Sequence, residues 1–449
     1  MTEHRFNLVV PLAHKATAMR DEDTGRRRAV RSGAVSQLSD RSGDVDSTIV
    51  APTPGIRTTT TATRTTTTRA PRSARSPSAD WIEWGNGFSG DEVVTAYRDC
   101  RRTKRNSISA LAFEANLERN LVNLHDELAN GSYVPGRSKC FIITHPKPRE
   151  VWAADFPDRV VQHMIYNRIG PRFERSFIAD SCACIKGRGT LYAARRLEAK
   201  IRSITENWSR PAHYLKCDVA NFFVSIPKPL LLDLFLRKIP EPPWRWLTEV
   251  VLMHDPRENF DYLGNPALMD LVPPHKRLLE QRPHFGLAIG NLISQFAANV
   301  LLDVLDQFVK HALRVRHYIR YVDDFIFLDE SPARLNEILA KVTAFLPQYL
   351  GIDLNPHKTI LQPIERGVDF VGQVIKPWCR STRKRTRKEA LRRVAAAPAD
   401  EFLQVANSYF GLLGQASASH YDRAALANVV RSCGHAVNHA LTKTYRGSA

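Results

Sequence analysis

The sequence predicts an α+β fold, in which an antiparallel sheet is backed by helices. Strand-like and helix-like patterns alternate between residues 211 and 377, and two of the strands form a hairpin with acidic residues at its tip. Beyond residue 377 the pattern is helical and basic. With 449 residues, of which 43% are apolar, the chain can form about three folding units with globular cores.

The net charge indicates a polyanionic partner. The chain has 64 Lys and Arg against 46 Asp and Glu, which gives a net charge of +18. Residues 1–80 contain 13 basic and 8 acidic residues, so this segment carries +5 and the remainder +13. The excess is therefore not confined to a basic tail. Nucleic acid is the expected partner, because its phosphates release counterions when cations bind them.

Residues 1–80 are predicted to form a disordered extension, or to result from a start site placed too far upstream. They are rich in Arg, Ser and Thr, and such a composition cannot bury a core. The short apolar stretch at residues 8–13 lacks the longer apolar region of a secretion signal. No run approaches the roughly 18 apolar residues of a membrane-spanning helix. The seven scattered cysteines lack zinc-site spacing and suit a reducing compartment. We therefore expect a cytoplasmic protein without a membrane partner.

Ordered structure is predicted from about residue 81. Apolar spacing separates helices from strands, and glycine and proline mark their ends. The first predicted elements are a helix over 109–129, a strand over 140–144, a helix that contains Arg159, and a loop over 181–190 with Lys186 and Arg188. Glycines alternate with the cations in this loop, a composition that suits phosphate contacts.

The second half of the chain contains the acidic hairpin. Its predicted elements are a strand that runs into a turn over 213–226, a helix over 230–235, a proline-rich segment of loops and short helices to residue 283, a long helix over 292–309, strands over 317–320 and 325–328, a helix over 332–350, and strands over 352–354 and 370–375.

Two adjacent acids, Asp323 and Asp324, lie at the tip of this hairpin between apolar strands. Burying like charges is costly unless a cation compensates them. Asp218, at the end of a neighbouring predicted strand, would complete a set of hard oxygen ligands for divalent ions. A surface turn is the alternative, because Asp-Asp is common in turns.

Two motifs carry a resemblance to a known family. Tyr321-Val322-Asp323-Asp324 resembles the Tyr-x-Asp-Asp box of reverse transcriptases, and Asp218-Val219-Ala220-Asn221-Phe222-Phe223 resembles their first catalytic strand. The resemblance covers about residues 100–425 and implies a right-hand polymerase with fingers, palm and helical thumb. It implies that Asp218, Asp323 and Asp324 are catalytic. With Val219, they would bind two Mg²⁺ ions, or Mn²⁺ in their place.

Further segments resemble nucleotide-binding parts of the same family. Phe223 matches the position whose ring excludes a ribose 2′ hydroxyl, and a core role beside Phe222 is the alternative. Arg149 and Lys358 resemble residues near the incoming triphosphate and the leaving group. Arg159 resembles a fingers residue near the template. A solvated surface residue is the alternative for each of these cations.

Other segments resemble nucleic-acid contacts. Phe370-Val371-Gly372 looks like the hairpin that grips the primer, and the loop with Lys186 and Arg188 also looks like a segment of these enzymes. The basic residues over 380–388, among them Arg383 and Arg385, resemble a track for a template and primer duplex. A solvated basic face is the alternative for this track.

The segment over residues 286–295 indicates which subgroup of reverse transcriptases the chain resembles. The resemblance also implies that Gly290 and Gln295 bind the nucleotide. Group II intron enzymes usually have Pro-Gln-Gly and then Ser-Pro at these places, whereas this chain has Ile-Gly and then Ser-Gln. The variant is similar to reverse transcriptases of bacterial diversity-generating retroelements and of related antiviral defence groups.

The resemblance implies an N-terminal region with fingers over 81–210, a palm over 211–377 and a basic helical thumb over 378–449. The implied activity is RNA-directed DNA synthesis from an RNA template, a nucleic-acid primer and deoxynucleoside triphosphates, with a non-coding RNA or accessory protein as an optional partner. Two alternatives stay open. One is a non-catalytic RNA-binding protein, either maturase-like or a scaffold, and the other is a template-independent nucleotidyltransferase.

Overall fold

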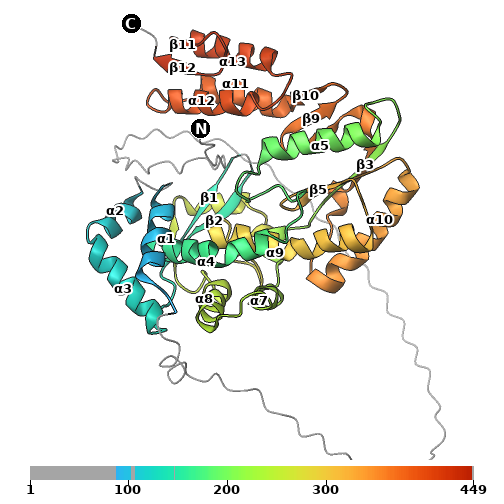
Figure 1. Ribbon diagram of the computed structural model, residues 1–449. Coiled ribbons are helices and arrows are strands. Elements are labelled where there is room, and N and C mark those ends of the chain that lie inside the picture. The colour runs from blue at the N-terminus through green and yellow to red at the C-terminus, as the bar shows by residue number, and fades with distance from the viewer. Residues whose placement is uncertain (1–86, 103–106, 146, 447–449) are drawn as a thin grey trace, which may run out of the picture. The chain divides into compact units, whose positions relative to one another are not determined.

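Helices α4 (Phe156–Glu174) and α9 (Leu292–Gln307) pack against each other in the main hydrophobic core (Figure 1). The computed structural model describes residues 87–102, 107–145 and 147–446, so the predicted extension over residues 1–80 lies outside the described part. The rings of Phe173 and Phe296 meet edge to face between the two helices at 5.5 Å. Both helices are buried on more than one side, which explains why they are apolar around most of their circumference.

The strands that carry the predicted acids form an antiparallel sheet in the order β5-β6-β3-β7. Their bounds are β3 (His213–Asp218), β5 (Tyr318–Tyr321), β6 (Asp324–Asp329) and β7 (Ile360–Pro363). Side chains alternate between two cores along each strand. Leu215 and Phe325 join the main core with α10 (Pro332–Phe345), whereas Tyr214 and Ile326 join a second core with α5 (Thr190–Ile204). The sheet is therefore backed by helices on both faces.

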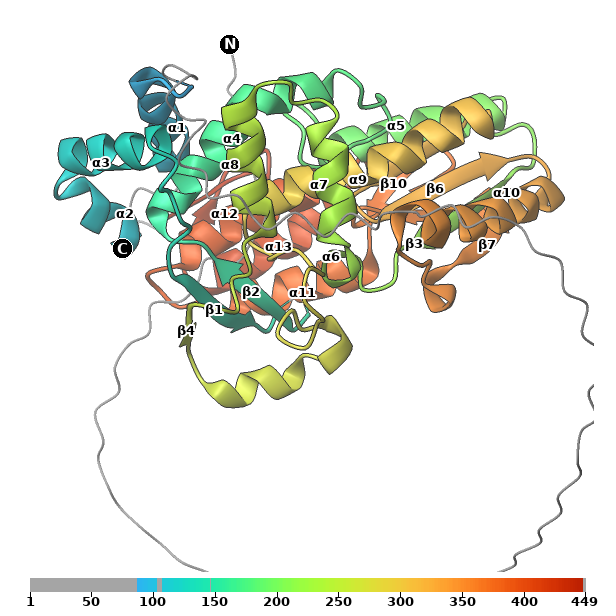
Figure 2. The ribbon, with the colours of Figure 1, turned by 90° about the horizontal axis from the view of Figure 1, so that it is seen from below.

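A second sheet has the order β2-β1-β4 and includes a strand from the proline-rich segment (Figure 2). Strand β1 (Ser138–Ile143) pairs antiparallel with β2 (Arg149–Ala153) and parallel with β4 (Phe260–Leu263). Trp152 and Phe260 contact each other edge to face at 4.9 Å. The segment before β4 also forms the regular helix α8 (Pro242–Met253). The proline-rich segment is thus built into the fold rather than looped out of it.

A third sheet, β8 (Val368–Phe370), β9 (Gln373–Lys376) and β10 (Cys379–Thr382), leads into the C-terminal helices. These helices share their own core, and a hairpin of β11 and β12 follows them. The pairing of β9 with β10 crosses the predicted limit between residues 377 and 378, and the domain limits stay a prediction. The elements are α11 (Lys384–Ala395), α12 (Phe402–Leu413), α13 (His420–Ser432), β11 (His435–Val437) and β12 (Thr444–Arg446).

The remaining helices of the described residues are short or peripheral. They are α1 (Gly90–Arg102), α2 (Ile108–Glu114), α3 (Leu117–Ala129), α6 (Phe222–Ser225), α7 (Lys228–Leu236), the 3₁₀ helices η3 (Pro266–Leu271), η4 (Pro274–Lys276), η7 (Pro356–Lys358) and η8 (Ile364–Arg366), and the π turns η5 (Phe308–Ala312) and η6 (Leu346–Leu350).

The structure differs from the predicted elements at several places. The helix predicted over 109–129 is broken into α2 and α3, and the Asn120 side chain donates to the Phe113 carbonyl across the break. The strand predicted over 352–354 makes only one bridge, between Leu354 and Val219, and the sheet strand is β7 instead. The strand predicted over 370–375 is the hairpin of β8 and β9, because it turns at Val371 and Gly372 with positive φ at both residues.

The helical stretch Leu292–Ala312 is long and apolar enough to cross a membrane by length and composition alone. However, 72% of its most apolar window is buried inside the structure, against partners such as α4 and α7. A core helix of a soluble fold passes the same test, so this stretch is weak evidence for a membrane span.

Candidate active site

The acidic turn, residues 321–324, joins β5 to β6. Tyr321 and Asp324 are the last ladder pair of the hairpin, so Val322 and Asp323 form its two-residue connection. Val322 has a φ of +55°, a left-handed conformation that β-branched residues rarely adopt. The tight connection places Asp323 at the tip, immediately before Asp324 at the start of β6.

Asp218 lies directly opposite Asp324. The two residues are ladder partners across the antiparallel strands β3 and β6, and the Val219 N–H donates to the Asp323 carbonyl at 3.3 Å. Directly opposed residues of such a pair have Cβ atoms about 4.5–5.5 Å apart. The sheet therefore brings Asp218 beside Asp323 and Asp324, which follow it by more than a hundred residues in the sequence.

Two lysines neutralise part of this charge. Lys216 Nζ lies 2.9 Å from Asp324 Oδ2, and Lys358 Nζ lies 2.5 Å from Asp218 Oδ1. Lys216 also donates to the Asp369 carbonyl at 2.9 Å, so it is held in place from two sides. Lys358 is half exposed and belongs to η7. The resemblance had singled out Lys358, whereas Lys216 carried no sequence signal beyond its position on β3.

Burial dominates the ionisation of the acidic turn. Burial, with the neighbouring carboxylates of Asp218 and Asp324 adding to it, raises the pKa of Asp323 to about 6. Burial also raises the pKa of Asp324, although the ammonium of Lys216 opposes that shift. The ionised form of this site is therefore costly without a further cation.

The donor set of the site fits divalent metal ions. All three side chains offer hard oxygens, and Asp324 Oδ1 is buried without a hydrogen-bond partner among the described residues. A cation would satisfy that oxygen and would lower the pKa of Asp323. Nevertheless, within residues 87–102, 107–145 and 147–446, no group of three or more His, Cys, Asp or Glu side chains is arranged to hold a metal ion. A metal ion at Asp218 would compete with Lys358 for Oδ1, whereas Lys216 pairs only with Oδ2 of Asp324 and leaves its Oδ1 atom available.

Phe223 and Gly290 lie on two segments that a backbone hydrogen bond joins. The Leu287 N–H donates to the Phe223 carbonyl at 2.7 Å, which ties α6 to the residues before α9. Phe223 is half-buried, and its ring meets the Phe222 ring edge to face at 5.4 Å. Gln295 lies half-buried in the first turn of α9. The structure therefore leaves part of the Phe223 ring accessible, as a contact with a nucleotide requires.

Gly290 allows the backbone of this segment to approach β2 closely. Its φ is +121°, and a Cβ atom there would lie 2.7 Å from the Trp152 carbonyl oxygen. The Trp152 N–H in turn donates to the Ile289 carbonyl at 2.8 Å. The role that the structure gives Gly290 is therefore this close approach of the two backbones.

Cations from five separate segments lie near one another, and one of them, Lys358, pairs with Asp218. The pKa of Lys147 is lowered by burial and then by the neighbouring charges of Lys358, Arg149, Arg385 and Lys276. These five residues, here called the cation cluster, come from the connection of β1 to β2, β2 itself, η4, η7 and α11. Arg149, Lys276 and Arg385 are exposed. Lys147 and Lys276 were missed in the sequence, although Lys147 lies only two residues before Arg149.

Other predicted cations are engaged elsewhere. Arg159 Nε donates to the Ala154 carbonyl at 2.7 Å, and Arg188 Nη1 donates to the carbonyls of Ile178 and Ser181 at 2.7 and 2.8 Å. Both side chains therefore hold backbone segments in place. Arg383 Nε pairs with Asp369 Oδ1. Lys186, by contrast, is exposed on its loop.

Two expected nucleic-acid contacts require correction. Phe370 is completely buried in the second core, where its ring meets Tyr321 edge to face, so it cannot contact nucleic acid through its ring. Arg380 is also buried, and its guanidinium donates to Glu198 Oε2 at 2.9 Å and to the Gln415 carbonyl at 2.8 Å. The spacing of apolar residues in the sequence could not distinguish these buried residues from the partly exposed Gly372 at the hairpin turn and the exposed Arg385.

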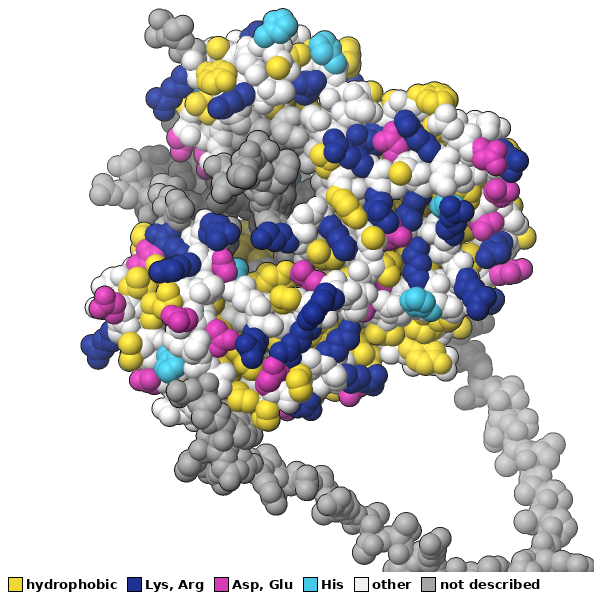
Figure 3. Space-filling view, in the orientation of Figure 1, with side chains coloured by type: hydrophobic (Ala, Val, Ile, Leu, Met, Phe, Trp, Pro, Cys, Tyr) yellow, Lys and Arg dark blue, Asp and Glu magenta, His cyan; other side chains and the backbone are white. Residues whose placement is uncertain are grey.

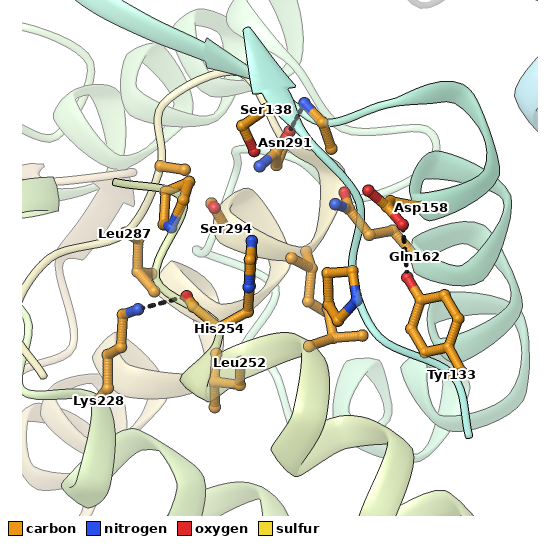
Figure 4. A pocket seen from close by; sticks show the side chains of 16 residues that line it. Tyr133, Ser138, Asp158, Gln162, Lys228, Leu252, His254, Leu287, Asn291 and Ser294 are labelled. Atoms are coloured by element: carbon orange, nitrogen blue, oxygen red, sulfur yellow. Dashed lines mark hydrogen bonds between the residues drawn. The ribbon is translucent and has the colours of Figure 1, made fainter. Parts of the chain in front are cut away.

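A cavity of about 40 Å³ lies beside the start of α9 (Figure 4). Leu287, Ala288 and Asn291 line it, together with residues of α4 and α8. The His254 ring points into the cavity, and its Nε2 atom is buried without a hydrogen-bond partner in the described part of the chain. The cavity can hold a few water molecules. Asp218, Asp323 and Asp324 do not line it, so it is separate from the acidic site.

Comparison with known proteins adds a family match and distant structural neighbours, two of which are described here. Residues 146–375, about half of the chain, match the family model described as reverse transcriptase (RNA-dependent DNA polymerase). No curated protein sequence gives a significant match. The chain is similar to the solved structure of apo telomerase from Candida tropicalis, truncated from the C-terminal domain, with 13% identity, a TM-score of 0.39 and coverage of 54% of this chain and 53% of that chain.

The second neighbour is telomerase from Candida albicans in complex with a TWJ fragment of telomeric RNA. Here the identity is 10% and the TM-score 0.40, and the match covers 66% of this chain and 55% of that chain. This chain therefore spans about half the length of either structure.

Proposed function

The chain belongs to the reverse transcriptase family, and we propose that it is an RNA-directed DNA polymerase that adds deoxynucleotides to a primer 3′ end. The observation that carries the proposal is the opposition of Asp218 and Asp324 across β3 and β6, with Asp323 at the adjacent tip. A surface turn with two acids would need no third acid opposite it. Nor would it raise the pKa of Asp323 by burial.

In this proposal two Mg²⁺ ions would be held by the side chains of Asp218, Asp323 and Asp324 and by the backbone of Val219. When bound, the ions would activate the primer hydroxyl and neutralise the leaving phosphates. The cation cluster attracts and orients the triphosphate before the reaction. Lys358 exchanges its contact with Asp218 for a contact with the triphosphate. The role of Lys358 is supported by its contact with Asp218.

The choice of deoxynucleotides is assigned to Phe223. Phe223 follows Asp218 by five positions, and its side chain is half-buried. Its backbone carbonyl is held by a hydrogen bond from the Leu287 N–H. In this proposal the ring packs against the sugar of the incoming nucleotide and excludes a 2′ hydroxyl. The same side chain separates this proposal from an RNA-copying polymerase.

The template and primer are proposed to bind through the basic surface of the protein. Lys and Arg side chains are spread over the face seen in Figure 3, with acidic side chains among them. Lys186 and Arg385 are exposed members that the sequence resemblance also indicated. We expect the affinity for nucleic acid to fall with increasing salt, because counterion release drives such binding.

The biological setting is proposed from residues 289–295. Ile289 with Gly290, and Ser294 with Gln295, are similar to the variant found in bacterial diversity-generating and antiviral reverse transcriptases. We infer a cytoplasmic enzyme that copies an RNA template, with a non-coding RNA or accessory protein as a further partner. Neighbouring genes test this inference: near-identical repeats would favour diversification, and an adjacent structured RNA without repeats would favour defence.

The activity is tested by primer extension. The purified protein is incubated with a primed RNA template, Mg²⁺ and labelled deoxynucleotides, beside the double variant Asp323→Ala, Asp324→Ala. We expect template-dependent extension by the wild type only. Extension without a template would instead indicate a template-independent nucleotidyltransferase. RNA binding without extension, under varied primers and metal ions, would favour a non-catalytic RNA-binding protein.

A further inference from the structure

Arg320, three residues before Asp323, is completely buried inside the fold. Its side chain on β5 has 0% exposure, and so does its partner Asp306 on α9. Arg320 Nε donates to Asp306 Oδ1 at 2.9 Å, and Nη2 donates to Oδ2 at 2.6 Å. A buried charge is costly unless it is paired and hydrogen-bonded, and this two-point pairing meets that requirement.

The remaining donors of Arg320 are also satisfied. Nη1 donates to Asn299 Oδ1 at 3.2 Å and to the Val322 carbonyl at 3.1 Å, and Nη2 donates to Ser181 Oγ at 2.9 Å. An arginine has five N–H donors, and each one here has an acceptor. The contacts connect β5, α9, the segment around Ser181 and the acidic turn through one side chain.

The bond to the Val322 carbonyl connects this network to the acidic turn. That carbonyl belongs to the peptide that links Val322 to Asp323, and Val322 is in the left-handed region with a φ of +55°. Such a conformation persists in a β-branched residue only when surrounding contacts hold it. The Arg320 guanidinium is the side-chain donor that fixes the direction of this peptide.

The backbone of Arg320 strengthens the same connection. Its N–H donates to the Asp180 carbonyl at 2.9 Å, and its carbonyl accepts from the Cys182 N–H at 2.9 Å. Asn299, which accepts from Arg320, donates in turn to the Ala183 carbonyl at 2.8 Å. The strand before the acids is therefore held rigidly against the segment that leads to Lys186.

We propose that Arg320 is a positioning residue, which orients the Asp323 carboxylate by holding the Val322 carbonyl. The inference rests on the proposed polymerase function, and it assigns a task to a residue that touches neither nucleotide nor primer. A lysine cannot perform the task, because a single ammonium lacks the planar fork that reaches Asp306 and Val322 together.

The test compares Arg320→Lys with Tyr318→Phe in the full chain. Tyr318 donates to Asp306 Oδ1 at 2.7 Å, so its variant weakens the same network but leaves the Arg320 bond to Val322 in place. Four quantities are measured for each variant: kcat and KM for deoxynucleotides on a primed RNA template, the affinity for Mn²⁺ alone by calorimetry, and Tm.

For Arg320→Lys we expect kcat to fall about 10- to 100-fold, because a small misplacement of a catalytic group lowers the reaction rate by about this much. KM should change by less than about twofold. The affinity for Mn²⁺ should fall several-fold. Tyr318→Phe should keep both kcat and Mn²⁺ affinity within about threefold of the wild type, at a similar loss in Tm. Unchanged kcat and Mn²⁺ affinity in Arg320→Lys would overturn the proposal, as would equal losses in both variants.

A paired replacement keeps the proposal testable if Arg320→Lys does not fold. Arg320→Met combined with Asp306→Leu removes both buried charges together, a change that buried ion pairs often tolerate. This variant also lacks the bond to Val322, so the same losses of kcat and Mn²⁺ affinity are expected. If the wild type itself gives no extension, the proposed function fails, and the Mn²⁺ affinities of the variants still decide the positioning role.

Discussion

Lys358 Nζ lies 2.5 Å from Asp218 Oδ1, so a lysine holds one of the carboxylates that the proposed reaction needs. The lysine side chain is half exposed, and an ion pair of this kind contributes only about 0–1 kcal/mol. The pair is therefore weak enough to open when a stronger cation arrives. Removal of the Lys358 ammonium should therefore have opposite effects on metal binding and on catalysis.

We expect Lys358→Gln to increase the affinity for Mn²⁺ alone by up to about fivefold, because Asp218 loses its competing ammonium. The same variant should lower kcat/KM for deoxynucleotides by about 10- to 100-fold, since a charge that stabilises the leaving phosphates is lost. Calorimetry and primer extension measure the two effects. Parallel losses of both metal affinity and activity would contradict the proposed exchange of partners.

The raised pKa of Asp323 predicts that replacing its carboxylate stabilises the protein to an extent that depends on pH. Because the pKa is about 6 in the folded protein and about 4 in the unfolded chain, the ionised carboxylate destabilises the metal-free fold above pH 6. Asp323→Asn should therefore raise the free energy of unfolding at pH 8 by roughly 1–3 kcal/mol, and Tm should rise with it. The gain should shrink as the pH falls through 6 and vanish near pH 4.

Thermal unfolding in the presence of a chelator, over pH 4 to 8, measures this gain. Asp329→Asn is a matched control, because Asp329 lies at the opposite end of the same strand β6. A gain that is independent of pH, or one that is equal in the control, would argue against a buried acidic site.

Phe223→Ala should admit ribonucleotides if the ring excludes the 2′ hydroxyl. The expected result is a fall of about tenfold or more in the ratio of deoxynucleotide to ribonucleotide kcat/KM, because steric exclusion is removed. Phe222→Leu is the control, since Phe222 is buried in the core and its variant should affect stability more than sugar selection. Unchanged selection in Phe223→Ala would leave Phe223 as a packing residue.

The cation cluster predicts that Lys276, in the proline-rich segment, contributes to triphosphate binding. Lys276→Ala and Arg149→Ala should each raise KM for deoxynucleotides roughly two- to fivefold at low salt, with the difference narrowing at high salt because screening weakens exposed charges. Steady-state kinetics at two ionic strengths measure this effect. Lys341→Ala, an exposed lysine on α10, should change KM little. A shift in the control as large as in Lys276→Ala would remove the special role of the cluster.

The sequence predicted the elements around the acids well, and the α+β fold is confirmed. Strands β5 and β6 could be predicted because apolar residues flank Asp323 and Asp324 on both sides. Helix α9 could be predicted because its apolar face is long. Local spacing suffices for such features, because each depends on neighbours within one element. The roles of the site residues themselves stay predictions that the experiments above address.

What could not be predicted depends on contacts between distant segments. The parallel pairing of β4 with β1, and the presence of Lys276 in the cation cluster, join residues that are more than a hundred positions apart. Phe370 and Arg380 were misassigned for the same reason. An aromatic residue or an arginine near a functional hairpin has the same local pattern whether it points toward solvent or toward a core such as that of α5.

The order of strands in the acidic sheet has a consequence for how the chain folds during synthesis. Strand β3 emerges from the ribosome first, yet both of its neighbours, β6 and β7, are made more than a hundred residues later. Pairing over such separations is slow, because a long loop must close before the contact forms. Until residue 329 has been made, β3 has two unpaired edges, and the edge that pairs with β7 stays unpaired until residue 363. Unpaired strand edges are prone to aggregation. Helix pairs whose members are both made early, such as α1 with α4, can form before the acidic sheet is complete.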